Sequence, residues 1–154
     1  MVQYRPNVAA LMLNAKGRLL ICERAGSPGA WQFPQGGVDP GESLKEGLRR
    51  EIEEEIGLQA KDYSIIEKKG GYRYLYPKGV REKKLQKHGN HGQEQTYYLC
   101  QLEAKESKIN VHQSPQEFGN HKWIKPKEFD INWLPKFKQD VYRDVMRDFF
   151  GVEI

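Results

Sequence analysis

The segment from Gly36 to Leu58, GGVDPGESLKEGLRREIEEEIGL, constrains the fold of this 154-residue chain more than any other. Ser43 and Glu46 have the spacing of a capping box, in which the two side chains accept hydrogen bonds from backbone N–H groups at the start of a helix. Apolar residues then recur every four positions, as on the buried side of a helix: Leu44, Leu48, Ile52 and Ile56. Gly57 suits a left-handed helix end. The segment therefore predicts a helix from about residue 44 to 56.

The second half of this helix is crowded with glutamates. Like charges at helical spacing repel by a few tenths of a kcal/mol per pair, and the helix dipole disfavours anions near the C-terminus. At about 100° per residue, three carboxylates converge within an arc of roughly 100°: Glu51, Glu54 and Glu55. A glutamate run is ordinarily solvated surface, but these three flank the apolar stripe and so lie near the core. Convergent carboxylates suit Mg²⁺ or Mn²⁺, and the segment predicts a metal site that accepts a phosphate-bearing substrate.

The rest of the chain predicts several strands and one further helix. The expected strands are residues 7–14 and 18–24, joined as a hairpin, and residues 31–33, 63–69, 71–76, 94–102 and 121–124. Residues 35–37 and 77–92 carry turn or polar chemistry and predict loops. Residues 134–151 predict a helix that ends at Gly151. This pattern predicts one α/β (α+β) domain over residues 1–154, with a mixed sheet covered on both faces.

Charge and composition narrow the class of protein. The net charge is +4, and residues 68–87 hold eight lysines and arginines against only Glu82. A lysine-rich tract is often plain solvated surface, but this one adjoins three tyrosines and would suit a phosphorylated ligand with bases to stack. No apolar run approaches the roughly 18 residues of a membrane span. The segment MVQYRPNVAALMLN lacks the pattern of a secretory signal, and Cys22 and Cys100 lie in apolar segments as expected of buried free thiols, so we expect a cytoplasmic protein.

The acidic helix and the loop before it resemble the Nudix box. The matching residues are Gly36, Glu42, Arg50, Glu51, Ile52, Glu54, Glu55, Gly57 and Leu58. The resemblance extends to YRPNV, WQFPQGG, the RY and PK of RYLYPK, GQEQ and FKQDVYRDVM, which are similar to the bacterial RNA pyrophosphohydrolase branch and its dinucleoside polyphosphate hydrolase relatives. The resemblance implies the fold of an α/β/α sandwich. It also implies an enzyme that uses Mg²⁺ or Mn²⁺ to cleave phosphoric anhydride bonds in an RNA 5′ end or a nucleotide.

The resemblance also implies roles for individual residues. Glu51, Glu54 and Glu55 fall on the family's metal-binding and catalytic glutamates, one of which is also a candidate general base. Glu117 matches a further carboxylate, and Gly36 and Gly37 would let the backbone approach metal and phosphate. The positions that match or suggest substrate contacts are Arg5, Arg24, Tyr74, Gln93, Phe137 and Lys138. Apart from the resemblance, Glu117 and each of these cations would be ordinary surface residues, and Phe137 a core residue of the last helix.

Three functions remain open at this point. The first is removal of pyrophosphate from the 5′-triphosphate end of RNA, which leaves a monophosphate and promotes mRNA decay. The second is hydrolysis of dinucleoside polyphosphates or nucleoside triphosphates. The third is a nucleotide- or RNA-binding module without catalysis, and the intact Glu51, Glu54 and Glu55 count against it. The basic tract and the Phe137–Lys138 pair favour RNA.

Overall fold

The computed structural model describes the backbone of residues 1–154 and every side chain except that of His88. Seven strands form one mixed sheet: β1 (Tyr4–Leu13), β2 (Leu19–Arg24), β3 (Trp31–Gln32), β4 (Gln35–Gly37), β5 (Tyr63–Leu75), β6 (Gly92–Leu102) and β7 (Phe118–Ile124). The central order is β3-β2-β1-β6-β5, with β4 paired to β1 and β7 paired to β2. Only the β1–β6 pair is parallel. The mixed sheet is therefore confirmed.

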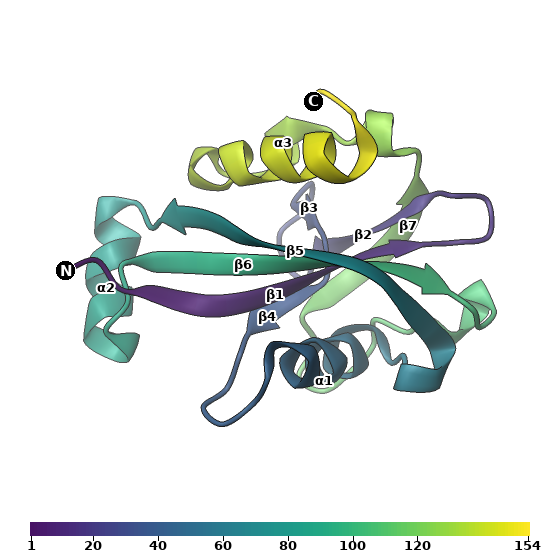
Figure 1. The fold of residues 1–154 in the computed structure, drawn as a ribbon, viewed down its shortest axis with the longest axis horizontal. Helices are drawn as coiled ribbons and strands as arrows, with labels where there is room; N and C mark the ends of the chain where they lie inside the picture. Colours follow the sequence, from purple (N-terminus) through teal and green to yellow (C-terminus); the bar gives the residue numbers. More distant parts are fainter.

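Two helices cover opposite faces of this sheet, and a third lies at one end (Figure 1). They are α1 (Leu44–Ile56), α3 (Lys136–Phe150) and α2 (Lys78–His88), respectively. Short 3-10 helices occupy Ala60–Asp62, Glu106–Lys108, Pro126–Glu128 and Ile131–Trp133. The expected α/β/α sandwich is confirmed.

The sheet has a separate core on each face because side chains alternate along a strand. From β1, Ala9 and Leu11 pack toward α3, whereas Val8, Ala10 and Met12 pack toward α1. The sheet therefore separates two apolar cores, one beneath α3 and one beneath α1.

Helix α1 matches its prediction closely. Ser43 caps it, with Glu46 N donating to Ser43 Oγ at 3.1 Å and Ser43 N donating to Glu46 Oε1 at 2.9 Å. Gly57 ends the helix with φ of 74°. Three of the four predicted stripe residues are buried against the sheet, and only Leu44 is exposed.

Several local predictions were wrong. Residues 77–92 do not form a loop, because most of them build α2, which begins after Pro77 and ends at Gly89 with φ of 71°. Its side chains are largely exposed, so its good helix formers build a helix that no apolar stripe in the sequence predicts. The two strands predicted over residues 63–69 and 71–76 are one strand, β5, which ends at Leu75. Its register shifts beside Gly70–Gly71, since a bulge absorbs the glycine pair that suggested a break.

Residues 35–37 also differ from the expectation. They form the short strand β4, in which Val8 pairs with Gly36 and Asn7 pairs with Gly37. Neither glycine has a positive φ, so backbone freedom does not explain them.

Candidate active site

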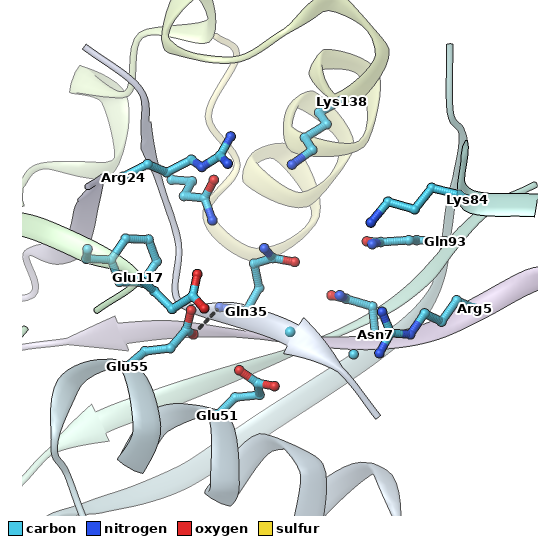
Figure 2. Close-up of a pocket in the computed structure, with 14 residues that line it drawn as sticks. Arg5, Asn7, Arg24, Gln35, Glu51, Glu55, Lys84, Gln93, Glu117 and Lys138 are labelled. Carbon is cyan, nitrogen blue, oxygen red and sulfur yellow. Dashed lines mark hydrogen bonds between the residues drawn. The ribbon is translucent and has the colours of Figure 1, made fainter. Parts of the chain in front are cut away.

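A polar cavity of about 400 Å³ opens where α1, β1, β4 and β6 meet. Carboxylates of Glu51, Glu55 and Glu117 face it from one side (Figure 2). Cations face it from the other side: Arg5, Arg24, Lys84 and Lys138. The cavity therefore has an acidic half and a basic half, and these terms are used below for the two sets of residues.

Glu55 is the most buried member of the acidic half, with 4% of its surface exposed. Its Oε1 accepts a hydrogen bond from Gln35 N at 2.9 Å, and none of the ion pairs between described side chains includes it. Burial, followed by the negative charge of Glu51, raises the pKa of Glu55 well above its ordinary value. A buried carboxylate without a cation favours either a proton or a metal ion.

Glu51 lies one turn earlier on α1. Burial raises the pKa of Glu51, while its hydrogen bond with Arg50, 2.8 Å from Nη1 to Oε1, acts in the opposite direction. Glu117, although exposed, adds negative charge that raises the pKa of both Glu51 and Glu55. The acidic half thus concentrates negative charge that the protein itself compensates only in part.

Arg50 connects α1 to the loop that precedes it. Its guanidinium Nε lies 2.7 Å from Glu42 Oε2, and its Nη2 donates to Gly37 O at 2.9 Å. The hydrogen bond from Arg50 lowers the pKa of Glu42 to about 2, and the two side chains form an ion pair. Arg50 also lies 3.2 Å from Glu54. Glu54 is exposed and does not line the cavity, so the structure brings Glu51 and Glu55 together there but not the third predicted glutamate.

The two glycines of β4 make room for functional groups. A Cβ on Gly36 would overlap the carboxylate of Glu51, and a Cβ on Gly37 would overlap the guanidinium of Arg5. Each half of the cavity therefore depends on one glycine of the same short strand.

The basic half is assembled from four elements. Arg5 comes from β1, Arg24 from β2, Lys84 from α2 and Lys138 from α3. Partial burial, and then the charges of Arg24 and Lys84, lower the pKa of Lys138 to about 8. Cations held this close together favour an anionic ligand, because its charge would offset their mutual repulsion.

A second cavity of about 410 Å³ adjoins the first and is more aromatic. Tyr74, Tyr76 and Phe137 line it, with the Tyr74 and Phe137 ring centroids 5.5 Å apart. The Tyr74 hydroxyl donates to Gln93 Oε1. The two cavities share Arg24, Lys84, Gln93 and Lys138. A ligand that fills both would place phosphates in the polar cavity and flat rings in the aromatic cavity.

Sequence reasoning missed a buried hydrogen-bonded chain beneath the polar cavity. Tyr97 OH donates to Gln95 Oε1 at 2.9 Å, and Gln95 Nε2 donates to Asn7 Oδ1 at 3.0 Å. Asn7 lines the cavity, and its amide NH₂ remains to donate to a ligand oxygen. The parallel register that pairs Arg5 with Gln93 and Asn7 with Gln95 brings these residues together. The alternation of Gln93 and Gln95 is visible in the sequence, but the partner strand is not.

The residues of the acidic half fit a divalent cation by their chemistry. Among the described residues, no three His, Cys, Asp or Glu side chains are gathered tightly enough to form a ready-made metal centre. Glu51, Glu55 and Glu117 nevertheless supply hard oxygen ligands around one cavity, and the uncompensated charge of Glu55 would be relieved by a cation.

Comparison with known proteins gives the family. The description "NUDIX domain" matches residues 3–149. The chain belongs to the Nudix family. Nudix hydrolases generally need divalent metal ions, which accords with the acidic half of the cavity. Two similar proteins are the RNA pyrophosphohydrolases of Proteus mirabilis (strain HI4320), 39% identical over 97% of this chain and 84% of that protein, and of Haemophilus influenzae (strain PittEE), 37% identical over 97% and 76%.

Solved structures of other Nudix hydrolases share the fold. The E. coli dihydroneopterin triphosphate pyrophosphohydrolase superposes with a TM-score of 0.68 at 18% identity, covering 97% of each chain. A C. elegans Ap4A hydrolase binary complex superposes with a TM-score of 0.60 at 18% identity, covering 96% of this chain and 98% of that one. These likenesses establish the Nudix fold. Among the described residues, no helix combines the length and apolar character needed to cross a membrane.

Proposed function

We propose that this Nudix domain removes pyrophosphate from the 5′-triphosphate end of RNA, leaves a 5′-monophosphate and so promotes mRNA decay in the cytoplasm. The observation that carries the proposal is the junction of the two cavities. Arg24, Lys84, Gln93 and Lys138 line both of them, so one ligand can place its phosphates among cations and its first bases among aromatic rings. Relatives named RNA pyrophosphohydrolase align over nearly the whole chain and support this substrate.

The proposed roles follow from the two halves of the polar cavity. Glu51, Glu55 and Glu117 would hold Mg²⁺ or Mn²⁺, and Glu54 would join them by family resemblance, although Arg50 pairs with it here. A divalent ion, when bound, supplies charge neutralisation at the phosphates and favours ionisation of the attacking water. One of the clustered glutamates accepts the proton of that water.

The basic half and the aromatic cavity orient the substrate. Arg5, Arg24, Lys84 and Lys138 contact the phosphate oxygens, with the Asn7 amide as a further donor. Phe137 and Tyr74 stack on the first bases, and the Tyr74 hydroxyl fixes the carboxamide of Gln93. These contacts position the reacting phosphate beside the acidic half, and such positioning lowers the barrier to reaction.

Turnover measured side by side tests the proposal. Triphosphorylated RNA, a nucleoside triphosphate and a dinucleoside polyphosphate are each supplied at equal concentration, first with magnesium and then with manganese. We expect the highest kcat/KM on RNA, with pyrophosphate released and monophosphorylated RNA as the other product. Equal or greater kcat/KM on the small nucleotides would replace RNA with the second candidate substrate class. If no substrate is turned over with either metal, the remaining candidate function is a nucleotide- or RNA-binding module without catalysis.

A further inference from the structure

Helix α2 carries a strong positive charge that the active site uses only in part. Its charged side chains are Lys78, Arg81, Lys83, Lys84 and Lys87 against Glu82. Arg81 is occupied locally, since its Nε donates to Tyr76 O at 3.0 Å. Among the described side chains, no ion pair involves the lysines of α2. This concentration of positive charge without carboxylate partners suits an external polyanion.

The lysines are arranged directionally around the helix. At about 100° per residue, Lys83 and Lys87 lie within roughly 100° of Lys84 on one side of α2, whereas Glu82 lies on the opposite side. Lys84 extends from α2 toward Gln93 and the polar cavity (Figure 2). Lys83 and Lys87 are exposed. One side of the helix therefore leads from the cavity rim to open surface through three successive cations.

The aromatic cavity opens onto the same side of α2. Val80, one turn before Lys84, lines that cavity and remains 40% exposed. Lys84 lies at both cavities, and its Nζ is 5.9 Å from the Tyr76 ring centroid. A nucleotide chain that leaves the aromatic rings on this side meets Lys84 first and then the exposed lysines.

We propose that α2 is the exit track for the RNA strand, which passes Lys84 at the cavity rim and binds Lys83 and Lys87 through the phosphates downstream of the first bases. The inference rests on the proposed function and deepens it. Lysine–phosphate contacts release counterions and do not read sequence. The track therefore raises affinity for longer single-stranded RNA of any sequence, and a dinucleotide gains little from it.

The test pairs a charge reversal with substrates of two lengths. The variant is Lys83→Glu/Lys87→Glu, which leaves Lys84 in place. The matched control is Lys16→Glu/Lys105→Glu. It changes the net charge by the same amount at two exposed lysines that lie in loops rather than on α2. Both are assayed on a triphosphorylated dinucleotide and on a triphosphorylated single strand of about ten nucleotides, with KM and kcat measured across a salt series, and melting curves confirm folding.

We expect kcat/KM on the longer strand to fall about tenfold or more at low salt in the variant, mainly through KM, because two phosphate contacts are lost. The slope of log(kcat/KM) against log[salt] should flatten by about 1.4, at about 0.7 for each lost single-strand contact. The dinucleotide and the control variant should change much less. Equal losses on both lengths, or an equal loss in the control, would overturn the track.

A binding measurement separates this inference from the proposed function. Anisotropy with a labelled, 5′-monophosphorylated strand of about ten nucleotides requires no turnover. Weaker binding in Lys83→Glu/Lys87→Glu than in the control supports the track even if the wild type hydrolyses no RNA, in which case only the proposed reaction fails. Identical binding in the two variants rejects the track while leaving the reaction intact.

Discussion

The two halves of the polar cavity are built in opposite ways. The acidic half depends mainly on one capped helix, in which Glu51 and Glu55 are one turn apart. The basic half draws Arg5, Arg24, Lys84 and Lys138 from four elements that are far apart in the chain. The acidic half is therefore set by local structure, whereas the basic half exists only when the whole sheet has formed.

The acidic half should therefore tolerate substitution less well than the basic half. The glutamates of α1 are held close to one another by helix geometry even though their charges repel, and burial removes the water that would screen them. The cations are long, flexible side chains that can adjust singly. Changes in the acidic half should abolish activity, whereas changes in the basic half should reduce it stepwise.

The largest expected effect is at Glu55. Glu55→Gln keeps the size of the side chain and removes its charge, and turnover should fall by at least about two orders of magnitude, the scale of a lost catalytic carboxylate. Glu53→Gln, on an exposed position of the same helix, is the control and should retain activity. Near-wild-type turnover of Glu55→Gln with saturating magnesium would contradict the role of the acidic half.

The same substitution should raise stability without metal. Folding raises the pKa of Glu55. The ionised carboxylate therefore lowers the free energy of unfolding once the pH exceeds the pKa of a glutamate in the unfolded chain, about 4.3. Glu55→Gln should therefore melt higher than wild type at neutral pH in a chelator, and the gap should close as the pH falls toward that value. Adding metal should stabilise wild type more than the variant. A lower melting temperature for Glu55→Gln in chelator would remove this explanation.

The glycine pair of β4 can separate the two halves directly. Gly36→Ala should displace the Glu51 carboxylate, and Gly37→Ala should displace the Arg5 guanidinium, because the added Cβ overlaps each group. A displacement of about 1 Å can cost up to about a hundredfold in rate. We expect Gly36→Ala to lower kcat and to lower the affinity for the metal ion. We expect Gly37→Ala to raise KM for the phosphate substrate. The same pattern of kinetic defects in both variants would refute the division into halves.

The acidic half of the cavity could be predicted from the sequence far better than the basic half. The α1 helix, its caps and the placement of Glu51 and Glu55 beside the buried stripe were predictable because each signal lies within one turn of the next, whereas Glu54 is exposed outside the cavity. Lys84 was missed as a pocket residue because α2 shows no apolar periodicity, and Asn7 was missed because its meaning depends on the parallel pairing of β1 with β6. Arg5, Arg24 and Lys138 were found only through family resemblance, since an isolated surface cation carries no local signal.

Phe137 tests whether the aromatic cavity extends the basic half toward RNA. Phe137→Ala should reduce kcat/KM on triphosphorylated RNA about ten- to a hundredfold more than on a nucleoside triphosphate, as expected for a lost base stack of roughly 1–3 kcal/mol. Phe137 also packs on the core beneath α3, so melting curves are needed. Equal loss on both substrates with a drop of about 3–5 kcal/mol in stability would assign Phe137 to the core alone.

A smaller effect is expected from the chain beneath the cavity. Tyr97→Phe keeps the buried ring and removes the donor that orients Gln95 and, through it, Asn7. A typical hydrogen bond contributes about 0.5–1.5 kcal/mol, so KM should rise by about two- to tenfold, with kcat little changed. Asn7→Asp, which replaces the ligand-facing donor with an anion, should cost more. A kcat defect in Tyr97→Phe without a KM effect would show that the chain does not serve phosphate binding.

The smallest effect concerns the charge of Lys138. Its pKa of about 8 means that the free protein carries the cation at neutral pH and loses it as the pH rises. A bound phosphate stabilises the protonated form, so kcat should remain level while kcat/KM falls, by at most about fourfold at half a pH unit above that pKa. Lys138→Arg keeps a charge that does not titrate in this range, and it should flatten this limb of the kcat/KM profile. If the limb persists in Lys138→Arg, a group other than Lys138 titrates there.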